Sequence, residues 1–118
     1  MDRFRAEQFL PLTPVAFEIL LALADGEQHG YAVMQEVNRR SGGAISLHAG
    51  TLYRALARLL EQEWIAELDA PPRHASRDDE RRRYYRLTGH GIAIARAEAA
   101  RLADQVAAAR ARRLLVHP

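Results

Sequence analysis

The chain of 118 residues contains no cysteine, no lysine and no long apolar run. The absence of cysteine excludes disulfide bonds and thiolate metal sites, and a reducing cytosol is the natural compartment for such a chain. The longest apolar runs, such as Ile19–Ala24, are far shorter than the roughly 20 residues that span a bilayer. No basic-then-apolar signal segment opens the sequence. We therefore expect a cytoplasmic protein without a membrane-spanning segment.

Motifs for catalysis are also missing. The sequence has no glycine-rich phosphate loop and no nucleophile placed at a useful spacing from a base. Five histidines are present. Pairs such as His74 with Asp78, or His29 with Glu36, nevertheless lack the convergent set of ligands that zinc requires. The sequence therefore indicates neither an enzyme, nor a metal site, nor a cofactor.

The charge of the chain is unusual in its placement rather than in its amount. All 17 basic residues are arginine and 15 residues are acidic, so the net charge is only +2. Residues 73–86 hold six of the arginines beside Asp78, Asp79 and Glu80. The planar fork of arginine suits phosphates and guanine edges, although genomic base composition can also produce an arginine-only repertoire. The position of each arginine in the fold is therefore more informative than its type.

Size and periodicity predict one domain that begins with two helices. The first helix starts at Thr13-Pro14, because threonine caps a helix and proline at the first helical position loses no needed hydrogen bond. Asp25-Gly26 ends it. The second helix covers residues 30–40, and its apolar spacing is expected to bury three side chains. These are Tyr31, Met34 and Val37.

The third predicted helix, residues 48–63, has the most informative pattern. Four leucines recur at spacings of three and four and share one face: Leu52, Leu56, Leu59 and Leu60. The opposite face is small near its start and cationic further along, and consists of Gly50, Thr51, Arg54, Ala57 and Arg58. Such a face fits a groove between rows of phosphates. A solvated face in which the arginines pair with acids such as Glu61 is the alternative.

Short strands are expected around this helix. Ile45–Leu47 alternates and predicts a small strand before it. Trp64–Leu68 and Arg83–Leu87 predict a hairpin whose loop contains Pro71-Pro72. A helix with a small, basic outer face followed by a basic hairpin is the arrangement with which a winged helix meets DNA.

The sequence also predicts whether four aromatic side chains are buried or exposed. Trp64 is expected to anchor the core and the hairpin. Tyr53, on the flank of the third helix, is expected to be half core and half contact. Alternation along the strand predicts that one of Tyr84 and Tyr85 is buried and the other exposed.

Thr88 is expected to cap a last helix of residues 89–115, which would be about 40 Å long. Small and apolar residues form a seven-residue stripe along it: Ile92, Ala95, Ala99, Leu102, Val106 and Ala109. A helix that projects beyond a small head cannot bury this stripe on its own domain, so pairing with a second copy is expected. A helix folded back on the head is the alternative. The expected division is a winged helix-turn-helix DNA-binding domain, residues 1–88, and a dimerisation helix, residues 89–118, in one structural unit.

Three motifs in this order resemble the PadR family of bacterial transcriptional regulators, particularly its short members with one C-terminal helix. They are His29-Gly30-Tyr31, Gly50-Thr51-Leu52-Tyr53, and Arg82–Thr88 followed by Gly91. The resemblance implies a mainly α fold with a small β-hairpin, and a homodimer that represses by occupying an inverted-repeat operator in double-stranded DNA. A winged-helix module that binds a protein partner is the competing hypothesis, which the balanced net charge favours.

The resemblance also implies roles for single residues. The third helix becomes the recognition helix, and the residues that the resemblance places near DNA are Tyr31, Thr51, Tyr53, Arg54, Arg58, Arg81, Arg82 and Arg83. Tyr31 would reach a phosphate, and the three consecutive arginines would lie where the wing touches the backbone or minor groove. His48 is added from its own position at the start of the third helix, where it would contact a base or merely cap the helix. Asp78–Glu80 replaces the glycine and proline of many relatives and can offset the arginines. Ser46–Ala49 also departs from the family pattern, so base preference there cannot be transferred.

Some members of the family bind small molecules beside a tryptophan on the last helix. The only tryptophan here is Trp64, at the end of the third helix, so an aromatic pocket of that kind is not expected. A smaller effector, or none, stays open.

Overall fold

The computed structural model describes residues 4–115, and residues 1–3 and 116–118 of the expected domain division lie outside them. The described chain is mainly helical, with three short strands and a long last helix. Its elements are the 3₁₀ turn η1 (Ala6–Phe9), α1 (Pro14–Ala24), β1 (Gln28–His29), α2 (Gly30–Arg40), α3 (Ala49–Glu61), β2 (Ile65–Glu67), the 3₁₀ turn η2 (Asp79–Arg81), β3 (Tyr84–Leu87) and α4 (Gly89–Ala111). The predicted order of three helices, a hairpin and a long helix is confirmed.

Three of the four α-helices are capped by the side chain of the preceding residue. The Thr13 hydroxyl accepts from the Ala16 N–H at 3.2 Å, and the Thr88 hydroxyl accepts from the Gly91 N–H at 3.1 Å. Nδ1 of His29 accepts from the Ala32 N–H at 3.0 Å and caps α2. Each cap satisfies an amide that has no partner inside its helix, and this fixes where the helix begins.

The core lies where α1, α2, α3 and the first half of α4 meet. Its fully covered apolar side chains include Ile19, Leu20, Val33, Val37, Leu52, Leu56, Ile65 and Ile94. The prediction that α2 buries Tyr31 is wrong, because Tyr31 is 44% exposed. Val33 and Val37, four residues apart, supply the buried face instead, with Met34 half-buried beside them.

The small sheet has the strand order β1-β3-β2 and is antiparallel throughout. The predicted strand at Ile45–Leu47 does not form. Asn38 takes the place of a partner strand there, because its side-chain oxygen accepts from the Leu47 N–H at 2.9 Å. The third strand is β1, in which His29 lies opposite Tyr84.

Tyr84 and Tyr85 are both buried, with 5% and 3% of their surfaces exposed, so the prediction of one exposed tyrosine is wrong. Tyr85 belongs to the main core, and Tyr84 does not. The ring of His29 meets Tyr84 edge-on, with centroids 5.4 Å apart. Trp64 is buried as expected, and the ring of Phe9 lies edge-on to it at 5.3 Å.

Helix α4 is fastened to the turn between α3 and β2. The Thr88 N–H donates to the Trp64 carbonyl at 3.1 Å, and the Thr88 hydroxyl donates to the Glu63 carbonyl at 2.6 Å. Gly91 lies so close to the same carbonyl that a Cβ on it would be 1.9 Å from the Trp64 oxygen. Only glycine fits this position without moving the backbone.

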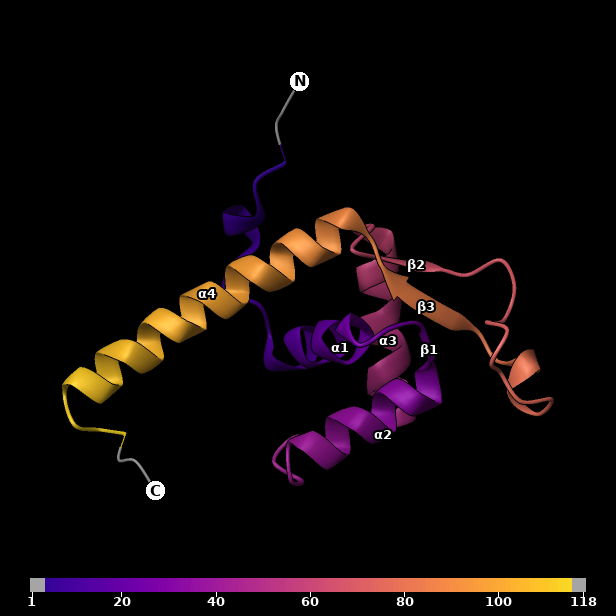
Figure 1. Ribbon diagram of the computed structural model, residues 1–118, viewed down its shortest axis with the longest axis horizontal. Helices are drawn as coiled ribbons and strands as arrows, with labels where there is room; N and C mark the ends of the chain where they lie inside the picture. The colour runs from indigo at the N-terminus through magenta and orange to yellow at the C-terminus, as the bar shows by residue number, and fades with distance from the viewer. Residues whose placement is uncertain (1–3, 116–118) are drawn as a thin grey trace.

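A second attachment ties α4 to the segment before α1. The buried carboxylate of Glu98 accepts from the Leu12 N–H at 2.7 Å and forms an ion pair with Arg101. The hydrogen bond from Arg101 lowers the pKa of Glu98 against the opposing effect of burial. Beyond this point α4 projects away from the head, on the opposite side from the wing formed by β2, β3 and their loop (Figure 1).

We expect Gly91→Ala to destabilise the fold by about 2–3 kcal/mol, because the added methyl group forces the Trp64 carbonyl and α4 apart. Urea unfolding followed by circular dichroism at one protein concentration measures the change. Gly89→Ala is the matched control, since a Cβ at Gly89 meets nothing within 4 Å. Equal stability of the two variants would contradict the close approach at Gly91.

Candidate nucleic-acid interface

The outer face of α3 is exposed as its sequence pattern predicts. Leu52, Leu56 and Leu59 face the core. The predicted outer residues Gly50, Thr51, Arg54, Ala57 and Arg58 are all exposed. Among the described residues, no carboxylate lies within 4.0 Å of the guanidinium of Arg54 or Arg58, so their pairing with Glu61 is not formed. Both charges are therefore available to an anionic partner.

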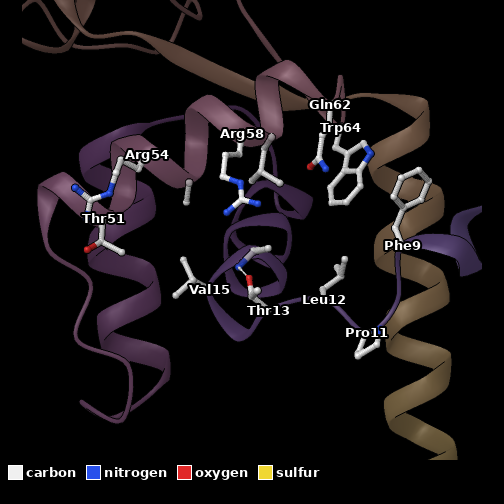
Figure 2. Close-up of a pocket in the computed structure, with 13 residues that line it drawn as sticks. Phe9, Pro11, Leu12, Thr13, Val15, Thr51, Arg54, Arg58, Gln62 and Trp64 are labelled. Atoms are coloured by element: carbon white, nitrogen blue, oxygen red, sulfur yellow. Dashed lines mark hydrogen bonds between the residues drawn. The ribbon is translucent and has the colours of Figure 1, made fainter.

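A groove of about 510 Å³ runs along one side of this face, between α3 and the segment that leads into α1. Figure 2 shows Arg58 projecting from α3 over the groove toward the start of α1, with Trp64 and Phe9 at one end and Arg54 at the other. Leu12, Val15 and Leu59 contribute apolar lining. The two guanidiniums thus stand at the border between an apolar groove and the solvent-exposed face of α3.

The residues at the start of α3 divide between exposure and packing. His48 occupies the N-cap position, but its side chain makes no cap hydrogen bond and is exposed. The capping role considered for His48 is therefore not realised. Tyr53 is 52% exposed, while its ring packs so closely on α2 that a Cβ on Gly30 would be 3.3 Å from it. Tyr53 is thus both a packing residue and a surface residue.

The wing arginines differ in how they are held. Arg83 pairs with Glu67 at 3.3 Å, and Arg82 pairs with Asp79 at 2.9 Å. Arg81 is exposed and has no carboxylate within 4.0 Å in the part of the chain that the structure covers. The expected offset by Asp78–Glu80 therefore operates through Asp79, and Glu67 adds a second offset for which the sequence carries no signal.

Tyr31 and Arg82, predicted separately as DNA contacts, are brought together in the fold. The guanidinium carbon of Arg82 lies 5.2 Å from the centre of the Tyr31 ring. His29, the last residue of β1, stacks on Tyr31 with ring centroids 6.4 Å apart. Sequence reasoning named His29 only as part of a motif and as a weak metal ligand, although a residue directly before a helix is a natural capping candidate.

The environment of His29 favours its neutral form. Burial lowers the pKa of His29, the charge of Arg82 lowers it further, and Asp79, whose carboxylate is 3.8 Å from Nε2, raises it. The cap acts in the same direction, because Nδ1 accepts a hydrogen bond only when it carries no proton.

No three histidine, aspartate or glutamate side chains among residues 4–115 converge as ligands for a metal ion. None of the described helices is both long and apolar enough to cross a bilayer.

Comparisons with known proteins give one matching family model and several similar solved structures. Residues 19–97 match the model of the transcriptional regulator PadR-like family. A transcriptional regulator from Clostridium thermocellum is 28% identical over 78% of this chain and 84% of its own, with a TM-score of 0.60. A PadR family transcription regulator from Clostridium difficile is 24% identical over 80% and 94% of the two chains, with a TM-score of 0.59. RosR from H. salinarum is 23% identical over 84% and 78%, with a TM-score of 0.60. The comparison with curated proteins gave no match.

The lowered pKa of His29 predicts a loss of stability in mild acid. The unfolded chain takes up a proton at this residue as the pH falls through about 6.5, whereas the folded chain resists it until its lower pKa is reached. The contribution is therefore complete above about pH 6.5 and decreases as the pH falls below it. Urea midpoints between pH 7.5 and 5.5 should fall more in the wild type than in His29→Asn, which keeps a capping side chain but cannot titrate. Parallel curves would rule out this contribution of His29.

Proposed function

Because the chain belongs to the transcriptional regulator PadR-like family, it is a transcription regulator rather than an enzyme, and we propose that it is a homodimeric repressor of an inverted-repeat operator. DNA binding follows from the family. The repressor role, the symmetry of the operator and the residues that contact it are the steps that the proposal adds.

The proposal rests on two arginines, Arg54 and Arg58, that lie on the exposed face of α3 without a carboxylate partner among the described residues. A recognition helix needs side chains that reach base edges from a rigid element, and a guanidinium can bond both acceptors of a guanine. Arg54 and Arg58 project from a helix whose other face is fixed in the core. His48, Thr51 and the exposed part of Tyr53 surround them at the start of the same helix.

Contacts to the DNA backbone come from the start of α2 and from the wing. Tyr31 is exposed at the first turn of α2, and Arg81 is exposed in the turn before β3. Arg82 and Arg83 add positive charge to the wing, although each is paired with a carboxylate. Such contacts set the orientation of a protein on DNA without reading its sequence.

The dimerisation surface that we propose is the stripe on α4. Ile92 and Val106 are exposed in the single chain, and Ala99 lies exposed between them. Leu102 is only partly covered. Because a lone subunit leaves these side chains in water, a second copy of α4 gains apolar burial by packing on them.

A winged-helix module for a protein partner is the second candidate. The pairing of Arg82 and Arg83 with acids favours it, because it removes part of the charge that a wing presents to phosphates. The two functions differ in their dependence on DNA sequence.

A salt titration on two duplexes tests the proposal. The first duplex comes from the region upstream of the gene and the second is a shuffled sequence of the same composition. If each subunit uses Arg54, Arg58 and Arg81, a dimer neutralises about six phosphates and the log–log slope is near −5. A repressor still binds the first duplex at salt concentrations where it has released the second, whereas equal loss on both contradicts the proposal. Arg54→Ala should reduce the difference between the duplexes by about 1–3 kcal/mol, and Arg39→Ala, at the far end of α2, should not.

Leu102→Arg should disrupt the dimer, because burying a charge in an apolar seam costs desolvation energy. Light scattering should then show monomers or aggregates. Ala108→Arg adds the same charge at an exposed position on a different face of α4 and should leave the dimer intact. A Leu102→Arg protein that is still dimeric would place the interface elsewhere.

A further inference from the structure

The sequence marks Arg82 as a DNA contact, but the fold engages it on both sides within the protein. We propose that Asp79 and Arg82 hold the wing against the start of α2, so that Asp79 positions the wing for DNA and Arg82 acts through Asp79 rather than on a phosphate. We call His29, Tyr31, Asp79 and Arg82 the wing latch. The inference rests on the proposed function, in which α3 and the wing bind one DNA duplex together.

Asp79 is itself fixed by the turn that it begins. Its N–H donates to the Ser76 carbonyl at 3.0 Å, and its own carbonyl accepts from the Arg82 N–H at 3.1 Å. Its carboxylate then accepts from Nε of Arg82 at 2.9 Å. The backbone and side-chain bonds close the same short loop, so the guanidinium of Arg82 has a defined direction.

The guanidinium of Arg82 points toward the first turn of α2. The guanidinium carbon lies 5.2 Å from the centre of the Tyr31 ring, which is within the range of a cation–π contact. His29 stacks on Tyr31, meets Tyr84 of β3 edge-on and places Nε2 3.8 Å from the Asp79 carboxylate. The latch therefore joins the first turn of α2 to the end of the wing loop, two segments about fifty residues apart in the sequence.

A phosphate would compete with this arrangement. The Nε–H of Arg82 already bonds a carboxylate, and one face of its guanidinium already covers a ring. Moving it to a phosphate would break both contacts and release the wing loop. Of the three consecutive arginines 81–83, Arg81 alone has no carboxylate partner among residues 4–115, so it is the one of the three that is available to the DNA backbone.

The sign of the effect at Asp79 separates a latch from simple repulsion. If the Asp79 carboxylate only repels phosphates, Asp79→Asn removes a negative charge and tightens DNA binding. If Asp79 holds the wing, the same change weakens binding despite the better charge. Asp78→Asn is the matched control, since Asp78 is exposed, lies next in sequence and has no arginine within 4.0 Å in the described structure.

Binding of the full-length protein is measured on the upstream and shuffled duplexes by fluorescence anisotropy at several salt concentrations. We expect Asp79→Asn and Arg82→Gln each to weaken binding about three- to tenfold on both duplexes, as an exposed ion pair with an added cation–π contact allows. The double variant should be no weaker than Arg82→Gln alone, because Arg82→Gln already removes the ion pair with Asp79. Their salt slopes should stay at the wild-type value, whereas Arg81→Gln should lower the slope by about 0.9 per subunit. Asp78→Asn should bind as tightly as the wild type or more tightly.

Hydrogen exchange of the DNA-free protein gives a second readout. Amides in residues 79–87 should exchange several times faster in Asp79→Asn and Arg82→Gln, and at the wild-type rate in Asp78→Asn and Arg81→Gln. Tighter or unchanged DNA binding by Asp79→Asn with unchanged exchange overturns the latch, as does a lower salt slope in Arg82→Gln. A wild type that shows no preference for the upstream duplex overturns the proposed function instead, and the exchange data still decide the latch.

Discussion

The contact of Gly91 with the Trp64 carbonyl sets the geometry of the whole molecule. This carbonyl accepts a hydrogen bond from the Thr88 N–H, and the first turn of α4 packs directly against it at Gly91. It belongs to the turn that ends α3 and begins β2. The candidate reading helix, the wing and the long helix therefore meet within a few residues. Because backbone atoms rather than side chains make the contact, it has little freedom to adjust.

A rigid joint has a consequence for the proposed dimer. If α4 carries the dimer contact and cannot swing at Gly91, the distance between two α3 helices depends only on how the two α4 helices cross. The spacing between half-sites in an operator then reflects that crossing, since dimeric helix-turn-helix proteins read half-sites about one helical turn of DNA apart. Glu98 reinforces the constraint, because its bond to the Leu12 N–H ties α4 to the start of α1 as well.

Local patterns predicted the order of the helices and the buried face of α3, while contacts between distant segments escaped them. The bounds of α1 agree with its Thr13 cap and its Asp25-Gly26 end, and α2 covers the predicted residues 30–40. Helix α3 ends before the predicted residue because Glu63 has a left-handed φ of 63° and the Trp64 N–H returns to the Leu59 carbonyl. A glycine usually occupies such a left-handed position at the end of a helix, so a glutamate there gives no signal in the sequence that the helix ends. Strand β1 has two residues and no periodicity, and it places His29 against Tyr84, a contact that the pattern of β3 does not indicate.

The contrast between local patterns and contacts of distant segments also applies to the candidate interface. Exposure of Arg54 and Arg58 follows from the period of α3, so the sequence alone could predict it. The ion pairs of Arg82 and Arg83 could not be predicted from the sequence. The turn of the chain brings Asp79 to Arg82, and the register of the sheet brings Glu67 to Arg83. A count of arginines treats the five predicted DNA contacts, Arg54, Arg58 and Arg81–Arg83, as equal charges. In the described structure the two on α3 and Arg81 have no carboxylate within 4.0 Å, whereas Arg82 and Arg83 are paired. A basic wing can thus be partly a structural element, in which charge holds the hairpin in place before any phosphate is met.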